Sequence, residues 1–374
     1  MSRAEDVRWM RRALRLAARG RGTTSPNPMV GAVVVKRGRV VGEGYHREAG
    51  GPHAEVYALR QAGAGAAGAT AGAGAAGATV YISLEPCPHH GRTPPCTEAL
   101  AAAGVSRVVA ACLDPDARVN GKGLRWLSRR GIHTEVGVLE AEARKLNEAY
   151  FKRVTRGLPF VSLKAAMSLD GKTATAGGES KWITGEKARA FGHNLRADHD
   201  AVMVGIGTVL ADDPELTVRL AKGRTPLRVV IDSRARTPVG ARLIGADEKP
   251  PLIVTAREAP DARRRRLAEA GATVWVARSR AGRIDLRSLL RRLAGHGVQS
   301  ILLEGGGTLA AGALADGLVD RVYFFVAPKL IGGERAPTPV DGPGVGRLAS
   351  AAKLGALRTR RIGEDLLITG EVLP

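Results

Sequence analysis

Residues 79–96 read TVYISLEPCPHHGRTPPC, a short apolar run typical of a buried strand followed by Cys87 and Cys96. Upstream, His53 and Glu55 stand at the start of a predicted helix. One histidine and two thiolates would occupy three positions around tetrahedral Zn²⁺ and leave the fourth for water, as catalytic zinc sites do. The metal lowers the pKa of that water, and Glu55 can move its proton without coordinating zinc. The pattern predicts a zinc-dependent deaminase with His53, Cys87 and Cys96 as ligands.

The spacing of the two cysteines leaves a second interpretation open. The general deaminase signature is C-x-x-C, whereas PHHGRTPP separates Cys87 from Cys96 here. Both thiols can still converge if the intervening residues form a loop that bulges outward. Alternatively, His89 or His90 supplies a fourth ligand and the zinc is structural, as in a non-enzymatic zinc module. The third cysteine, Cys112, lies in the apolar run VVAAC and is predicted to be a buried core residue.

Outward from this motif, the first half of the chain predicts an α/β/α layered domain. Apolar residues at helical spacing from Val7 to Ala17 predict a helix ended by Gly20, and two β-branched runs joined by a Gly-containing turn predict a hairpin. The sheet is expected to begin with that hairpin and to continue mainly parallel. The predicted strands are 29–35, 39–45, 79–84, 107–113 and 134–138, and the predicted helices that alternate with the later ones are 54–61, 97–103 and 124–130.

An exact tandem copy interrupts this pattern between a helix and a strand. Residues 62–70 and 71–79 both read AGAGAAGAT. Long surface loops add little closure entropy, so we interpret the copy as a tolerated insertion without a function.

The second half predicts a separate α/β domain. A polar helix over 140–151 leads to the basic segment 152–159, which ends in Gly and Pro and suits a domain junction. We therefore expect a deaminase domain over residues 1–150 and a second domain over 158–374. Its predicted strands are 160–166, 201–204, 228–232, 252–255, 273–277, 300–304 and 321–328, and its predicted helices include 186–196, 285–294 and 308–314.

Length and composition limit the class of protein. The chain has 374 residues, 44% of them hydrophobic, which is enough for two cores, and its formal net charge is +21. The arginines are spread through both halves rather than gathered in a tail, so the charge suits a soluble basic surface or phosphate recognition. A nucleic-acid deaminase, such as a tRNA-editing enzyme with an appended domain, is the rival interpretation, and it predicts salt-sensitive polynucleotide binding.

Targeting signals and cysteine usage indicate a compartment. The charged N-terminus lacks the apolar core of a signal peptide, and no run is long and apolar enough to span a membrane. With only three cysteines, two of them in the metal motif, a disulfide framework is implausible. A cytoplasmic protein with no membrane partner is expected. Its oligomeric state is left open, a homo-oligomer included.

The second domain contains no G-x-G-x-x-G after a strand, so a Rossmann motif is not indicated. Instead, Glu304 and three glycines end an apolar strand and begin a helix, where backbone N–H groups can face a phosphate. A plain glycine turn is the competing interpretation. The segment 228–236, RVVIDSRAR, ends a strand in a serine and two arginines that could hold the 2′-phosphate of NADPH, unless this is only a solvated basic loop.

These motifs together resemble the bifunctional riboflavin biosynthesis deaminase/reductase family across nearly the whole chain. The resemblance is carried by PNPMVGAVVV, GEGYH, HAEV, SLEPCPHHGRTPPC, DPDARVNGKG, SLDG, WIT, VLADDPELTVR and VDRVYFFVAPKLIGG. It implies a cytidine-deaminase-like α/β/α domain followed by a dihydrofolate-reductase-like α/β domain. It also implies hydrolytic removal of the 2-amino group from a diaminopyrimidinone with a phosphoribosylamino arm, and then NADPH-dependent reduction of the ribose to a ribityl chain.

The resemblance assigns roles to residues of this chain. His53, Cys87 and Cys96 would bind one zinc, with Glu55 as the proton shuttle. Asn27, His46, His89 and Arg92 would contact the deaminase substrate, although Asn27 between two prolines could equally serve a turn. NADPH would be approached by Ala166, Trp182, Thr208, Asp212, Ser233, Gly306, Gly307, Thr308, Leu309, Ala310, Ala311 and Gly312. The reductase substrate would meet Ser180, Arg196, Leu216, Arg219 and Glu304.

Lys164 is a further candidate in the reductase half, because it projects from the first strand of that domain and could hydrogen-bond the pyrimidine carbonyl that deamination creates. The competing interpretation is a surface lysine at a strand end. Arg196 and Arg219 have the charge and bidentate geometry of phosphate clamps. Asp212 and Glu304 are both candidates for the proton donor of the reduction.

Overall fold

The computed structural model describes residues 2–64, 73–91 and 93–373. Their contacts divide the chain into two compact units, Met1–Gly157 and Leu158–Pro374. No helix among these residues is long and apolar enough to cross a membrane.

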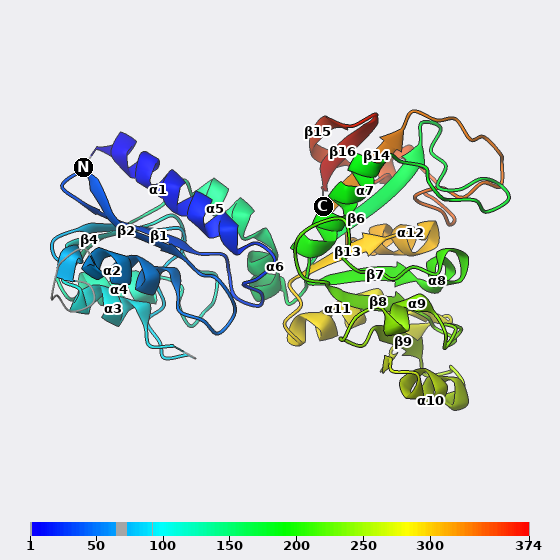
Figure 1. Cartoon of the computed structure of the whole chain (residues 1–374), viewed down its shortest axis with the longest axis horizontal. Helices are drawn as coiled ribbons and strands as arrows, with labels where there is room; N and C mark the ends of the chain where they lie inside the picture. The colour runs from blue at the N-terminus through cyan, green and yellow to red at the C-terminus, as the bar shows by residue number, and fades with distance from the viewer. Residues whose placement is uncertain (1, 65–72, 92, 374) are drawn as a thin grey trace. The chain divides into compact units, whose positions relative to one another are not determined.

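The first unit, which begins in blue at the N-terminus in Figure 1, contains a five-stranded sheet in the order β2-β1-β3-β4-β5. The hairpin partner β1 pairs antiparallel with both β2 and β3, whereas β3, β4 and β5 are parallel, which confirms the predicted sheet. The strands are β1 (Gly31–Lys36), β2 (Arg39–Tyr45), β3 (Thr79–Ile82), β4 (Arg107–Ala110) and β5 (His133–Val136).

Helices cover both faces of this sheet. Alternate strand residues point to opposite faces, so Val34, Val80 and Val108 pack into one core while Val33 and Val109 pack into the other. The first core contains α2 (Ala54–Ala64), α3 (Cys96–Ala102) and α4 (Lys122–Ser128), and the second contains α1 (Arg3–Ala17), α5 (Glu140–Leu146) and α6 (Glu148–Arg156). The α/β/α layering predicted from the sequence is confirmed.

Two helix predictions were wrong in detail. Helix α1 ends at Ala17 and a 3₁₀ turn, Ala18–Gly20, follows, so Gly20 does not cap it directly. The predicted helix 140–151 is two helices separated at Asn147. The Asn147 side chain accepts a hydrogen bond from the backbone N–H of Met29 (2.8 Å) and donates one to its carbonyl (2.9 Å). This long-range pairing holds Asn147 outside helical geometry, and α6 then extends through most of the predicted basic junction.

The described parts of the tandem copy lie next to each other. A Cβ built on Gly74 would stand 2.1 Å from the carbonyl oxygen of Ala62, so the two backbones touch and position 74 requires glycine. Ala62 and Ala75 are both buried in the first core. Residues 65–72 of the predicted insertion lie outside the described residues.

We expect deletion of 71–79 to leave both activities and the fold nearly unchanged. Because the two copies are identical, the copy that remains can take the place of residues 71–79 before β3, at the cost of residues 62–64 at the end of α2. A cost of about 1 kcal/mol would lower the melting temperature by about 2–4 °C, which calorimetry measures. A loss of more than about 10 °C would contradict the interpretation of the copy as a tolerated insertion.

The second unit contains a nine-stranded sheet in the order β10-β9-β8-β7-β13-β6-β14-β16-β15. Its strands are parallel from β10 to β14, and β16 and β15 are added antiparallel at one edge. The strands are β6 (Phe160–Ser168), β7 (Ala201–Gly205), β8 (Leu227–Ile231), β9 (Leu252–Ala256), β10 (Thr273–Ala277), β13 (Ser300–Glu304), β14 (Arg321–Ala327), β15 (Leu354–Ile362) and β16 (Asp365–Val372). A two-residue pair, β11 (Ser279–Arg280) and β12 (Arg283–Ile284), stands apart.

Helices also cover both faces of this sheet. One core contains α11 (Leu286–Gly295) and α12 (Gly307–Ala315), packed on inward residues such as Leu163 and Leu303. The opposite face carries α7 (Glu186–Asp198), α8 (Ile206–Asp212), α9 (Arg242–Gly245) and α10 (Asp261–Glu269). The predicted strands of this half are confirmed, whereas the β15–β16 hairpin was missed, because β15 is exposed along almost its whole length and shows no alternation of apolar and polar residues.

Candidate active sites

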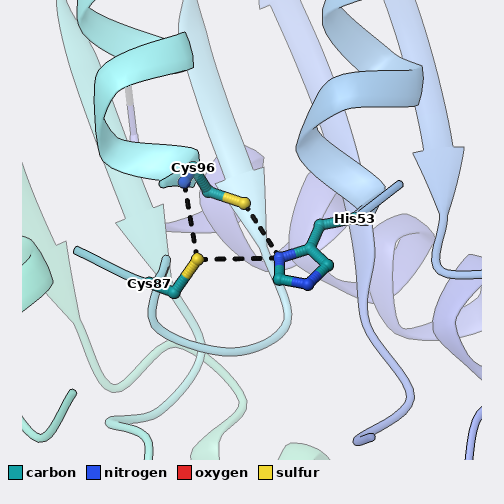
Figure 2. A group of neighbouring side chains, drawn as sticks. All are labelled: His53, Cys87 and Cys96. Atoms are coloured by element: carbon teal, nitrogen blue, oxygen red, sulfur yellow. Dashed lines mark hydrogen bonds between the residues drawn. The ribbon is translucent and has the colours of Figure 1, made fainter. Parts of the chain in front are cut away.

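The predicted metal ligands converge in the first unit. His53 immediately precedes α2, Cys87 follows β3 in the chain, and Cys96 is the first residue of α3. Nδ1 of His53 lies 3.1 Å from Sγ of Cys96 and 3.6 Å from Sγ of Cys87 (Figure 2). Zn–N bonds near 2.0 Å and Zn–S bonds near 2.3 Å place tetrahedral ligand atoms at about these separations. Both thiols lie within reach of one point although eight residues separate them in the sequence.

Hydrogen bonds tie the three groups together. The backbone N–H of Cys96 donates a hydrogen bond to Sγ of Cys87 at 3.4 Å. The hydrogen bonds from the Cys96 thiol and then from His53 lower the pKa of Cys87. The pKa of Cys96 is raised by its hydrogen bond to Cys87 and by burial. The pKa of His53 is raised by its hydrogen bond to Cys87. Cys87 is thus readied as a thiolate, the form in which cysteine binds metals.

Glu55 fits a shuttle beside such a group. It lies two residues after His53 in the first turn of α2 and is only 3% exposed, and burial raises the pKa of its carboxyl. Its Oε2 atom is enclosed and has no hydrogen-bond partner among the described residues. An enclosed carboxylate oxygen without a partner is costly unless a ligand completes it. These residues therefore suit a zinc ion with a coordinated water between His53, Cys87, Cys96 and Glu55.

A cavity of about 510 Å³ opens on this cluster, a size suitable for a small molecule. It is lined by Pro26, Asn27, Pro28, Val30, His46, Gly50, Gly51, His53, Glu55, Leu84, Glu85, Cys87, His89, Gly91, Thr93, Asp114, Asp116, Arg118, Val119 and Tyr150. Asn27, His46 and His89 thus stand in the wall where the sequence expected substrate contacts. Arg92 lies outside the described residues.

The polar atoms of this wall are connected. His46 Nδ1 lies 3.0 Å from the carbonyl of Pro52, which can only accept, so Nδ1 carries the hydrogen. Burial lowers the pKa of His46, so its Nε2 is free to accept from Nδ2 of Asn27 at 3.0 Å. His46 therefore orients Asn27 within the cavity. His89 has a buried Nδ1 without a partner among the described residues, which a ligand could complete.

Several pocket residues were not singled out from the sequence. Glu85, Asp114, Asp116 and Tyr150 line the same cavity. For Asp114 and Asp116 the signal was the segment DPDARVNGKG, which begins at Asp114 but suggests no role without the fold. Cys112 is fully buried in the core, as predicted.

In the second unit, an ion cluster lies where β6 and β13 run side by side. Lys164 pairs in register with Glu304, and Nζ of Lys164 stands 3.9 Å from Oε2 of Glu304. Arg196 from α7 contacts both oxygens of Glu304 at 2.8 Å and donates to the carbonyl of Thr217. Burial works against ionisation of Glu304, but the charges of Arg196 and Lys164 lower its pKa to about 2. Burial lowers the pKa of Lys164.

This cluster changes the expectations for Glu304 and Arg196. A carboxylate with a pKa near 2 holds no proton at neutral pH, so Glu304 does not suit the role of proton donor in this state. Arg196 is engaged by Glu304 and Thr217, so it is less free to clamp a phosphate than the sequence suggested. Arg219 is half exposed, bonded to Glu215 and Thr217, and its backbone N–H donates to Nδ1 of His193 at 3.0 Å.

The glycine turn lies beside the expected cofactor residues. Gly305 and Gly306 have φ of 65° and 82°, which favours glycine, and a Cβ on Gly305 would stand 3.0 Å from the Thr208 hydroxyl. Asp341 was missed from the sequence: its backbone N–H donates to the Gly307 carbonyl, and its carboxylate lies against Gly307 at the start of α12.

The remaining expected residues are placed as follows. Ser180 donates to Asp212 at 2.7 Å, and Trp182 is 62% exposed with Arg189 over its ring. Ala166 belongs to β6, and Ser233 follows β8. Leu216 is buried. Thr308, Leu309, Ala310, Ala311 and Gly312 form the first turns of α12.

Both halves of the chain match families of known proteins. Residues 3–112 match the cytidine and deoxycytidylate deaminase zinc-binding region, and residues 159–368 match the RibD C-terminal domain. The fold and the sites thus define a zinc-binding deaminase domain of the cytidine deaminase class joined to a reductase domain. The chain belongs to the riboflavin biosynthesis protein RibD family.

Relatives that align over nearly their full length support this family assignment. The chain is 44% identical to riboflavin biosynthesis protein RibD of Escherichia coli, over 97% of this chain and 98% of that protein. It is 41% identical to the Actinobacillus pleuropneumoniae protein of the same name, over 97% and 94%. The Acinetobacter baumannii RibD structure superposes with a TM-score of 0.88 at 39% identity over the full length of both chains.

A second solved structure adds a functional description. A Thermotoga maritima diaminohydroxyphosphoribosylaminopyrimidine deaminase/5-amino-6-(5-phosphoribosylamino)uracil reductase superposes with a TM-score of 0.84 at 34% identity, covering 99% of each chain. The expected fold class, a cytidine-deaminase-like domain followed by a dihydrofolate-reductase-like domain, is confirmed. The protein is a bifunctional deaminase and reductase of riboflavin biosynthesis.

Proposed function

We propose that the first domain hydrolyses the 2-amino group of 2,5-diamino-6-(5-phosphoribosylamino)pyrimidin-4(3H)-one and that the second reduces the ribose of the resulting uracil with NADPH. The observation that carries the first step is the convergence of His53, Cys87 and Cys96 beside the unpartnered oxygen of Glu55. The second step is supported by membership of the RibD family and by the ion cluster around Lys164. The second domain does not support the alternative function, a nucleic-acid deaminase.

In the deamination, this chain would hold the metal through His53, Cys87 and Cys96. Bound Zn²⁺ would supply a Lewis acid that lowers the pKa of a water toward neutrality. Glu55 would take a proton from the attacking water and deliver it to the departing ammonia, and its burial and raised pKa suit it to this transfer. Asn27, oriented by His46, and His89 would hold the pyrimidine ring, and Arg92 is proposed for the phosphate.

In the reduction, NADPH would supply the hydride, and the protein would supply position and charge. Lys164, which contacts Glu304, would donate a hydrogen bond to the pyrimidine carbonyl. Arg219 is proposed for the substrate phosphate, and Ser180 and Leu216 are proposed as further substrate contacts. The turn at Gly306 and the start of α12 would approach the cofactor together with Thr208, Asp212, Trp182, Ala166 and Ser233.

The proposal is tested by incubation with the diaminopyrimidinone substrate, with and without NADPH. Ammonia release without NADPH, followed by loss of nicotinamide absorbance on its addition, is the expected result. Salt-sensitive binding of RNA without ammonia release from the pyrimidine would favour the nucleic-acid alternative. A cytoplasmic location, in reducing conditions that keep Cys87 and Cys96 as thiols, is part of this proposal.

Cofactor choice is tested at Arg234 and Arg236, both exposed directly after Ser233. A charge-assisted hydrogen bond to the 2′-phosphate contributes about 1.5–3 kcal/mol, so Arg234→Ala should weaken NADPH about ten- to hundredfold and leave NADH nearly unchanged. The ratio of kcat/KM for the two cofactors measures this, with Arg291→Ala, an exposed arginine of α11, as the control. An unchanged ratio in both Arg234→Ala and Arg236→Ala would move phosphate recognition to other residues.

A further inference from the structure

A buried hydrogen bond joins two walls of the deaminase cavity. Asp114 lies beyond the end of β4, and Tyr150 lies in α6, so residues distant in sequence meet here. The Tyr150 hydroxyl donates to Oδ1 of Asp114 at 2.9 Å, and both residues are buried. The same oxygen accepts the backbone N–H of Asp116 at 2.9 Å.

The backbone beneath Asp114 is fixed from the opposite side. Oε2 of Glu85 accepts the N–H groups of Asp114 (3.3 Å) and Gly121 (2.8 Å), and Oε1 accepts those of Gly123 (2.9 Å) and Leu124 (3.3 Å). One buried carboxylate therefore holds both ends of the segment 114–124. With the backbone fixed in this way, the Tyr150 hydroxyl is the side-chain contact that, with the N–H of Asp116, holds the Asp114 carboxyl group through Oδ1.

We propose that Tyr150 is a positioning residue of the deaminase, whose hydroxyl holds the Asp114 carboxylate as a hydrogen-bond acceptor for the substrate. Tyr150 and the N–H of Asp116 occupy Oδ1, and among the described residues no hydrogen bond reaches Oδ2. Oδ2 is therefore available to a donor in the cavity, such as a ring N–H, an amino group or a ribose hydroxyl. This inference rests on the proposed deamination, because it assigns Asp114 to the same substrate.

The surrounding charges make this acceptor sensitive to pH. Burial raises the pKa of Asp114 to about 6; the charges of Asp116 and Glu85 add to the rise, and the hydrogen bonds from Asp116 and Tyr150 oppose it. Asp116 is itself paired with Arg118. Burial raises the pKa of Tyr150, so its phenol stays a donor. The other ionisable groups that line the cavity are His46, His53, Glu55, Cys87 and His89.

The direction of the effect follows from these contacts. Below its pKa, Asp114 is protonated and loses acceptor capacity, so kcat/KM falls on the acid side. Removal of the Tyr150 hydroxyl removes a bond that favours the ionised form, so the pKa of Asp114 rises further and the acid limb moves to higher pH.

The test compares Tyr150→Phe with Tyr81→Phe, which removes another buried hydroxyl of the same domain, bonded to Asp6 outside the cavity. For Tyr150→Phe, we expect KM at pH 7 to rise about tenfold with kcat within about twofold, and the acid limb of kcat/KM to move up by about one pH unit. Zinc content and reductase activity should match the wild type. Tyr81→Phe should keep the wild-type pH profile.

A second variant keeps the test decisive if Tyr150→Phe does not fold. Asp114→Asn retains the shape but cannot ionise, so it should raise KM and lose the acid limb near pH 6. A wild-type profile in either Tyr150→Phe or Asp114→Asn, or an equal shift in Tyr81→Phe, would overturn the inference while leaving the proposed deamination intact. Absence of ammonia release from the wild-type protein would overturn both.

Discussion

Glu55→Gln is expected to lower the kcat of deamination by about 10²–10⁴-fold while zinc remains bound. Glutamine preserves the shape of Glu55 but cannot take a proton from water and return it to the amine. Glu55 is enclosed, and its Oε2 has no hydrogen-bond partner among the described residues. No group bonded to that oxygen could therefore take over the proton transfer. The reductase belongs to a separate unit of the chain, so reduction of substrate that has already been deaminated should remain nearly intact.

Ammonia release, zinc content and NADPH oxidation measured on one preparation would check this prediction. Glu98→Gln is the matched control, because Glu98 is an exposed carboxylate in α3 that pairs with His90. Collapse of reduction together with deamination in Glu55→Gln would contradict the model of two independent sites.

Cys96→Ser and Cys87→Ser are expected to lose both the metal and deamination. A serine hydroxyl does not ionise near neutral pH, so it cannot replace the thiolate ligand. The lost Lewis acid contributes several kcal/mol, which corresponds to about 10³-fold or more in rate. Metal analysis of the purified variants should find about one zinc per chain in the wild type and little in either mutant.

Cys112→Ser provides the control for a cysteine replacement in the same domain. Cys112 is fully buried, and its thiol contacts the carbonyl of Ser83 at 3.7 Å rather than the metal cluster. This variant should keep its zinc. Full zinc occupancy in Cys87→Ser or Cys96→Ser would remove the ligand assignment and would favour a site completed by His89 or His90.

The proposed ligand set could be chosen from the sequence because each ligand type is chemically distinctive. The chain has only three cysteines, two of which follow a predicted strand closely, and the structure brings these two within reach of His53. The strands could also be predicted from the sequence, because inward residues such as Val80 and Leu303 belong to short apolar runs between loops. These features depend on local sequence, so periodicity and residue type were sufficient.

Contacts between distant residues were not predictable in the same way. Asn147 breaks a helix because it pairs with Met29, and Tyr150 reaches Asp114 only after β4 and α6 have packed. Glu304 had the residue type of a proton donor, yet Arg196 and Lys164 keep it ionised. A charged side chain has no fixed role until its partners and its burial are known.

The sequence by itself therefore determined the two α/β domains and was enough to propose the metal ligands and the proton-shuttling carboxylate, because periodicity and rare residue types are properties of the chain. Tertiary structure alone decided which polar groups meet and which atoms remain free: His46 supports Asn27, Glu85 holds the segment before α4, and Tyr150 holds Asp114. The physical reason is that hydrogen bonding and desolvation depend on distance and burial, which chain packing sets and local sequence does not.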